Sequence, residues 1–179
     1  MKEEVNFILR EWRLSDKASL AENANNINIW NNVRDYFPHP YTEKDGEEFI
    51  LMVTNKPGPI VEFAIEIDGK AVGGVGLVLS HDVERIDAEI GYWLGESYWG
   101  KGIVTRVVKK MVTYAFENLP LKKIHATVFD YNTASMKVLE NNGFEREAIL
   151  KQAAIKNGKI IDLHYFSLIK KGDIYLKET

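Results

Sequence analysis

Two glycines, Gly100 and Gly102, stand where an apolar, β-rich stretch of the sequence gives way to a helical one. Residues 92–105 read YWLGESYWGKGIVT. Glycine lacks a Cβ atom, so the backbone can approach an anion closely, and the free N–H groups at the start of the following helix point toward it. The positive end of the helix dipole adds to this attraction. We therefore predict an anion-binding loop of the kind that holds phosphate.

Basic side chains follow the two glycines at short intervals. Lys101, Arg106, Lys109 and Lys110 fall in or beside the predicted loop, and Lys137 is a further candidate. The whole chain nevertheless carries a formal net charge of −3, from 23 Lys and Arg against 26 Asp and Glu. This balance argues against nucleic acid as the main partner. The basic residues either neutralise a bound anion or line the solvated face of a helix.

Residues 95–102 come within one residue of the nucleotide-binding pattern G-x-x-x-x-G-K-[ST]. In that pattern the final Ser or Thr hydroxyl binds Mg²⁺. Gly102 occupies the final position and has no hydroxyl. Tyr98 and Trp99 place large side chains where such a loop must wrap closely around a phosphate. A P-loop-like nucleotide-binding protein is thus the least favoured interpretation.

Hydrophobic periodicity predicts the elements that would hold this loop. Alternation indicates strands over residues 5–11, 60–67, 71–79, 85–94, 123–129, 145–151 and 160–169. Helices are expected from residue 17, capped by Ser15 and Asp16, from residue 42, over 103–118 and over 133–142. Residues 23–40, rich in Asn and aromatics, are predicted to form a loop. The helix over 103–118 favours a parallel, right-handed crossover between its flanking strands, whereas the hairpins favour antiparallel pairs. We predict a mixed α/β (α+β) fold, with a mostly antiparallel sheet of about seven strands, in a single domain over residues 1–179.

Three ordered blocks resemble the GNAT N-acetyltransferase family. Residues 99–105 (WGKGIVT) are similar to its pyrophosphate-binding motif, although Trp99 stands for its Gln or Arg and Val104 for its final Gly or Ala. Residues 132–144 (NTASMKVLENNGF) match its block of Asn, small residue, helix and Gly-Phe, and residues 88–94 (AEIGYWL) resemble the preceding strand. The wording YWGKG resembles the RimJ/RimL-like branch, which includes ribosomal-protein N-terminal acetyltransferases. The resemblance covers nearly the whole chain and implies the GNAT fold, a twisted sheet with helices on both faces.

The resemblance implies acetyl-CoA as the cosubstrate. It would lie where the strand ending at Leu94 splays from the strand over residues 123–129, with its pyrophosphate on the N–H groups of Lys101 through Thr105. Asn132 would hydrogen-bond the pantetheine amides. The full set of implied cofactor residues is Trp93, Leu94, Trp99, Gly100, Lys101, Gly102, Ile103, Val104, Thr105, Asn132, Ser135 and Lys137.

The implied reaction is direct transfer of the acetyl group to a primary amine in a ternary complex. The sequence has no cysteine, which removes the commonest covalent carrier. Attack needs a neutral amine, so a base must accept a proton, and Glu89 in an otherwise apolar strand is the candidate. The alternative for Glu89 is an outward-pointing carboxylate paired with Lys or Arg. The backbone N–H of Trp93 or Leu94 would meet the thioester oxygen.

The leaving thiolate needs a proton donor. Many relatives use a Tyr four residues after the small residue of the Asn block, but Leu139 occupies that position here. Ser135 is the replacement that resembles the branch, with Tyr92 and Tyr165 in reserve. A Ser in the first turn of a helix is equally a local cap.

The acceptor side of the site is less well specified by the sequence. The residues predicted to line it are Trp30, Tyr36, Phe37, Glu89, His164 and Tyr165. For the aromatics the alternative is packing on the sheet, and for His164 it is a hydrogen bond to a neighbour. The acceptor, a protein N-terminus or a small-molecule amine, stays open. A non-catalytic acyl-CoA-binding module is the alternative function.

Several kinds of partner are not expected. The four histidines, His39, His81, His125 and His164, lack the spacing of a metal site, so we predict no metal. No apolar stretch is long enough for a membrane span, and the first residues lack a hydrophobic segment with a cleavage site. We therefore expect a cytoplasmic protein without a membrane or nucleic-acid partner. A homodimer through the exposed edges of the closing hairpin is compatible with the pattern.

Overall fold

A seven-stranded sheet forms the centre of the protein. The computed structural model describes residues 5–172, and the strands lie across the sheet in the order β1-β2-β3-β4-β5-β7-β6. The strands are β1 (Ile8–Arg10), β2 (Glu62–Ile67), β3 (Lys70–Leu79), β4 (Asp87–Leu94), β5 (Lys123–Phe129), β6 (Glu145–Lys156) and β7 (Lys159–Ile169). The helices are α1 (Lys17–Ala24), α2 (Ile27–Trp30), α3 (Glu43–Thr54), α4 (Ile103–Asn118) and α5 (Thr133–Glu140). Among the described strands, only β4 and β5 pair in parallel, which confirms the predicted mixed, mostly antiparallel sheet.

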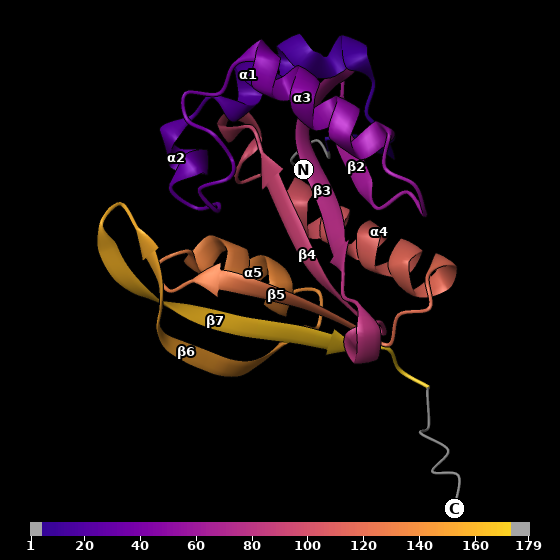
Figure 1. The fold of residues 1–179 in the computed structure, drawn as a ribbon, viewed down its shortest axis with the longest axis vertical. Coiled ribbons are helices and arrows are strands. Elements are labelled where there is room, and N and C mark those ends of the chain that lie inside the picture. Colours follow the sequence, from indigo (N-terminus) through magenta and orange to yellow (C-terminus); the bar gives the residue numbers. More distant parts are fainter. Residues whose placement is uncertain (1–4, 173–179) are drawn as a thin grey trace, which may run out of the picture.

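Helices cover both faces of the sheet, as predicted. On one face, Met111 of α4 packs in the larger core with Ile65 of β2. On the other face, Leu20 of α1 belongs to a second core with Ala64 of β2. Ala64 and Ile65 fall in different cores because successive strand residues point to opposite faces. Figure 1 shows α1 and α3 gathered over the β2 and β3 end of the sheet, away from β5 and β7.

The parallel pair β4 and β5 is joined by α4 and stays together only at its beginning. Residues 87–89 of β4 pair in register with residues 123–125 of β5. No later residue of β4 pairs with β5. Both strands run on beyond this point, to Leu94 and Phe129, and Figure 1 shows them diverging. The predicted splay between these strands is therefore present, and it ends at the glycine loop.

Two local predictions in the N-terminal part need correction. Residues 23–40 are not all loop, because α1 runs to Ala24 and Asn26 caps the short helix α2 by accepting hydrogen bonds from the N–H groups of Asn28 and Ile29. Asp16 does not cap α1 with its side chain. Its carboxylate is buried in an ion pair with Arg10 at 2.7 Å.

The closing hairpin is longer than predicted. β6 extends to Lys156 rather than ending near residue 151, with irregular pairing between Leu150 and Ala154. Gln152 has a φ of +52°, which breaks the alternation that the sequence pattern relies on. Asn157 and Gly158 form the turn of the hairpin, and both have positive φ, at 52° and 72°.

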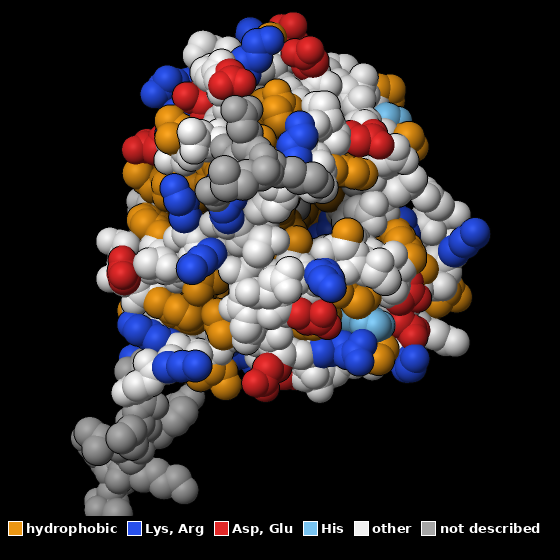
Figure 2. Space-filling view, turned by 180° about the vertical axis from the view of Figure 1, so that it is seen from behind, with side chains coloured by type: hydrophobic (Ala, Val, Ile, Leu, Met, Phe, Trp, Pro, Cys, Tyr) orange, Lys and Arg blue, Asp and Glu red, His pale blue; other side chains and the backbone are white. Residues whose placement is uncertain are grey.

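The outer surface carries charges of both signs. Seen from behind, Lys and Arg side chains are interspersed with Asp and Glu, with apolar side chains between them (Figure 2). Within residues 5–172, no helix combines the length and the apolar character needed to cross a bilayer.

Candidate active site

The glycine loop leaves open space at the start of α4. Gly100 and Gly102 have φ values of +70° and +69°, and a Cβ atom built on either would meet nothing within 4 Å. The first hydrogen bond of α4 runs from the Arg106 N–H to the Gly102 carbonyl at 3.3 Å. The amides of Ile103, Val104 and Thr105 therefore lie outside the helix ladder. The loop therefore combines open space beside its glycines with amides that make no helix hydrogen bond, and its binding of an anion stays a prediction.

Side chains of the loop fix its shape. The indole of Trp99 donates to the Leu94 carbonyl at 2.7 Å, which ties the loop to the end of β4. The ammonium of Lys101 turns back onto the loop, where it donates to the Ser97 carbonyl at 2.9 Å and lies 5.4 Å from the centre of the Tyr98 ring. The Trp99 and Lys101 side chains thus hold the loop itself.

The predicted basic cluster is divided in space. Arg106 and Lys110 lie over the ring of Phe7, at 5.0 and 4.9 Å from its centre, so both are drawn toward the N-terminal segment. Lys137 is exposed on α5. α5 is held against the first turn of α4 by Asn142, whose side-chain amide donates to the Thr105 carbonyl at 3.1 Å.

Backbone register decides which amide of β4 faces the splay. The Ser80 N–H donates to the Asp87 carbonyl at 3.1 Å, and the Gly95 N–H donates to the Val72 carbonyl at 2.8 Å. Odd-numbered residues of β4 therefore bond to β3, and even-numbered residues turn their N–H groups toward β5. This corrects the prediction for Trp93, whose amide belongs to the β3 ladder. Leu94 presents its N–H on the open side.

Tyr92 and Ser135 meet across the splay. The Tyr92 hydroxyl lies 2.8 Å from the Ser135 hydroxyl and 3.4 Å from the Ser135 carbonyl oxygen. Burial raises the pKa of Tyr92 to about 12, against the opposing effect of the Ser135 hydrogen bond. Asn132 holds the start of α5 in place, because its side-chain oxygen accepts from the Ser135 N–H at 3.1 Å. Leu139, where relatives carry a Tyr, is buried in the core.

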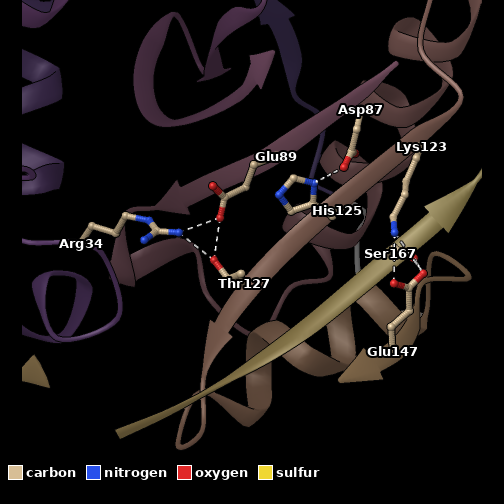
Figure 3. Close-up of polar contacts among 8 residues, drawn as sticks. All are labelled: Arg34, Asp87, Glu89, Lys123, His125, Thr127, Glu147 and Ser167. Carbon is tan, nitrogen blue, oxygen red and sulfur yellow. Dashed lines mark hydrogen bonds and ion pairs between the residues drawn. The ribbon is translucent and has the colours of Figure 1, made fainter. Parts of the chain in front are cut away.

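Glu89 is a carboxylate held by two donors (Figure 3). Its Oε1 accepts from Arg34 Nη2 at 2.8 Å and from the Thr127 hydroxyl at 2.6 Å. Burial opposes ionisation, but the Thr127 hydrogen bond and the Arg34 charge outweigh it and hold the Glu89 pKa below its ordinary value of 4.5. A base with a lowered pKa accepts protons poorly. The arrangement is better suited to attracting a cation than to removing its proton.

A row of polar side chains continues along β5 from this carboxylate (Figure 3). His125 lies with its Nδ1 2.9 Å from Asp87 Oδ2, and its ring stacks on Tyr165 at 5.0 Å between centres. Lys123 contacts the Glu147 carboxylate at 3.0 Å. Predicted Tyr165 is therefore on the same face as Glu89.

His164 does not join this row. Alternation along β7 turns it to the face opposite Tyr165, and its Nδ1 lies 3.3 Å from Arg146 Nη1. The prediction that His164 lines the acceptor side is therefore wrong, because a shift of one residue reverses the face.

The segment over residues 30–37 contacts both β4 and the end of β6. Phe37 lies edge-on to Trp93, with ring centres 5.7 Å apart, so these two rings form a wall beside β4. Trp30 is covered by the ammonium of Lys156, 3.6 Å from the ring centre, and Lys156 also pairs with Asp35 at 2.6 Å. Tyr36 is 82% exposed. Of the three predicted wall residues, Phe37 contacts the β4 side of the site.

Sequence reasoning missed Arg34 and gave Tyr92 only as a reserve. Arg34 lies 55 residues before Glu89, and no local pattern signals their contact. Among residues 5–172, no group of three or more His, Asp or Glu side chains could hold a metal ion.

Comparison with known proteins identifies the family. A family model described as an acetyltransferase (GNAT) domain matches residues 6–145. The uncharacterized N-acetyltransferase p20 of Bacillus licheniformis is 41% identical over 90 residues, which cover 50% of this chain and 51% of that relative. The ribosomal-protein-serine acetyltransferase of Escherichia coli is 30% identical over 97 residues, which cover 53% of this chain and 54% of that protein. The chain thus spans about half the length of these curated relatives.

A solved structure shares the fold over nearly its whole length. RimL, a ribosomal alpha-N-protein acetyltransferase solved in complex with coenzyme A, superimposes with a TM-score of 0.81 at 22% identity, covering 93% of this chain and 96% of that one. The named relatives agree with the RimJ/RimL-like resemblance of the YWGKG motif. Because the family model matches most of the chain, the protein belongs to the GNAT acetyltransferase family.

Proposed function

We propose that this protein transfers the acetyl group of acetyl-CoA to a primary amine by direct attack in a ternary complex. The observation that carries the proposal is the splay between β4 and β5. Pairing ends at Glu89, and the strand register turns the Leu94 N–H toward the β5 side. The Tyr92 and Ser135 hydroxyls lie 2.8 Å apart, and the glycine loop follows directly after β4. A thioester donor and an amine acceptor can meet there from the two faces of the sheet.

The residues present fit the cosubstrate. A side chain at Gly100 or Gly102 would fill the space that the cradle leaves open. The amides of Ile103, Val104 and Thr105 would bind the pyrophosphate. Asn132 uses its side-chain oxygen to cap α5, and its side-chain N–H groups make no hydrogen bond within residues 5–172, so they are free to donate to a pantetheine carbonyl. RimL, which shares this fold, binds coenzyme A.

Four groups of the chain would then serve the transfer. Acetyl-CoA, when bound, supplies an acetyl thioester. The Leu94 N–H would donate to the thioester oxygen, where negative charge develops as the C–N bond forms. Tyr92 and Ser135 would donate a hydrogen bond and a proton to the sulfur as the C–S bond breaks. Glu89 would attract the acceptor ammonium, in place of Arg34 or beside it.

The acceptor enters, in this proposal, on the face that carries Glu89, Tyr165 and the wall of Phe37 and Trp93. Acidic groups on this face, Glu89 and Asp87, favour a cationic acceptor. Both a protein N-terminal α-amine and a small-molecule amine satisfy this chemistry.

A panel assay tests the proposal. Thiol release from acetyl-CoA is followed with α-amine peptides, polyamines, amino acids and aminoglycosides. We expect at least one amine to accelerate release and to become acetylated. Tight binding of CoA without turnover on any amine would instead support a non-catalytic acyl-CoA-binding module.

A further inference from the structure

Glu62 lies on one line across the sheet with two glycines. It begins β2 and pairs with Gly76 of β3, which in turn pairs with Gly91 of β4. Gly91 stands between Glu89 and Trp93 on the same face of β4, because alternate residues of a strand share a face. Glu62 is therefore directed at the acceptor face from two strands away.

Because glycine has no side chain, Gly76 leaves room for the Glu62 carboxyl group, and Gly91 leaves the next position of the sheet open. A Cβ atom on Gly76 would lie 1.9 Å from Glu62 Oε2 and 2.3 Å from its Cδ, so the carboxyl group rests directly on this glycine. A Cβ atom on Gly91 would meet nothing within 4 Å. Neighbouring strands are about 4.8 Å apart, so the space above Gly91 is within reach of the carboxyl group directly or through one water.

The other side of Glu62 opens on a small cavity. A cavity of about 60 Å³ is lined by Trp12, Thr54, Pro59 and Glu62, with Glu11 and Lys56 as its other ionisable groups. It has room for water. The indole N–H of Trp12 is buried and has no hydrogen-bond partner among the described residues. A water in the cavity would connect Glu62 to solvent.

We propose that Glu62 accepts the proton of the acceptor amine across Gly76 and Gly91, and passes it to solvent through this cavity. In this step an N–H bond of the amine breaks and an O–H bond forms on the carboxylate, directly or through one water. The inference rests on the proposed acetyl transfer. It divides the work between two carboxylates: Glu89 attracts the ammonium, and Glu62 deprotonates it.

The environments of the two carboxylates agree with this division. Burial raises the pKa of Glu62 to about 7, and the charge of Lys56 opposes the shift only in part. Glu11 lines the same cavity, and Glu89 lies on the same face of the sheet. A group that titrates near neutral pH can accept a proton from an ammonium and release it again. Glu89, whose pKa is lowered, cannot do so as readily.

The test compares Glu62→Gln with Glu11→Gln, a change in the same cavity that leaves Glu62 intact. We expect Glu62→Gln to lower kcat by about 100-fold with an unchanged KM for acetyl-CoA, and to abolish the fall of kcat below neutral pH. The Glu11→Gln profile should match that of the wild type. The loss should shrink for amines whose own pKa lies below the assay pH, because they arrive neutral.

Glu62→Gln with the wild-type kcat and pH profile would overturn the inference, and so would an equal loss for neutral and protonated amines. Failure of this inference is distinguishable from failure of the proposed function. In the first case the wild type still acetylates an amine, and in the second it acetylates none. Titration of the Glu62 carboxyl by NMR, with Glu62→Gln to assign the signal, reports its pKa without turnover. A pKa near 4.5 would contradict the inference.

Discussion

The hydroxyl groups of Tyr92 on β4 and Ser135 on α5 lie 2.8 Å apart, across the opening between β4 and β5. The two residues come from the elements on either side of the proposed thioester site. Burial raises the pKa of Tyr92 to about 12, so the phenol keeps its proton throughout the range in which the enzyme would work. In the proposed reaction, the pair would supply a hydrogen bond to the leaving sulfur.

Removing either hydroxyl should slow the transfer. We expect Tyr92→Phe and Ser135→Ala each to lower kcat by about 10- to 100-fold, with little change in the KM for acetyl-CoA. Because the two hydroxyls act as one unit, the double variant should lose little more than the worse single variant. Tyr114→Phe is the control, since its hydroxyl bonds to the Ile60 carbonyl away from the site. Fully additive losses would show that the two hydroxyls act separately.

Arg34 and the acceptor should compete for Glu89. Glu89→Gln removes the charge that attracts an ammonium, so the KM for the amine should rise by about tenfold, equivalent to about 1.4 kcal/mol, while kcat changes less. Arg34→Ala should lower the KM for a cationic amine, because it removes the positive charge that competes with the amine for Glu89. Thr127 still donates a hydrogen bond to Glu89 in this variant. Steady-state kinetics at varied amine concentration distinguishes these outcomes. A large fall in kcat alone for Glu89→Gln would return the role of base to Glu89.

The glycine cradle can be tested against a matched turn. Gly102 and Gly69 have φ values of +69° and +77°, and a Cβ atom on either would meet nothing within 4 Å. Replacing each by Ala should cost about 1 kcal/mol of unfolding free energy, from the left-handed backbone alone. Only Gly102→Ala should also raise the Kd for CoA, because its methyl group enters the cradle. Equal CoA affinity in both variants, measured by calorimetry, would remove the cradle from the binding site.

The raised pKa of Glu62 also predicts how stability depends on pH. Its folded pKa of about 7 lies above its ordinary value of 4.5, so the folded state holds the proton more tightly than the unfolded state does. The contribution of this proton to the free energy of unfolding is fully present below pH 4.5 and is lost as the pH rises through 7. Glu62→Gln should therefore gain on the order of 3 kcal/mol relative to the wild type above neutral pH, and nothing in acid. Urea unfolding at both pH values measures the difference, and a constant offset would mean that Glu62 titrates normally.

Features encoded locally could be predicted from the sequence. β5 begins and ends at the predicted residues, Lys123 and Phe129, because its alternation is regular. Gly143, with a φ of +81°, follows α5 in the left-handed conformation that glycine favours. The cradle glycines are of the same kind, since only short-range backbone geometry decides their placement.

Features that depend on register or on long-range contact could not be predicted. The choice between Trp93 and Leu94 depends on which residues of β4 bond to β3, and the face of His164 depends on the same parity. Arg34 meets Glu89 only when the loop after α2 folds over β4. Glu62 lies on the acceptor face beside Gly76 and Gly91, which are its successive partners across the sheet. This pairing depends on strand register and cannot be read from the order of residues in the sequence.

The most direct test of the account is the stoichiometry of a single reaction. Enzyme, isotopically labelled acetyl-CoA and an amine from the panel are mixed, and mass spectrometry follows the amine, the protein and the released CoA. The account predicts one labelled acetyl group on the amine nitrogen for each free CoA, with no acetyl group retained on the protein. CoA release without acetylated amine, or label that stays on the protein, would contradict direct N-acetyl transfer.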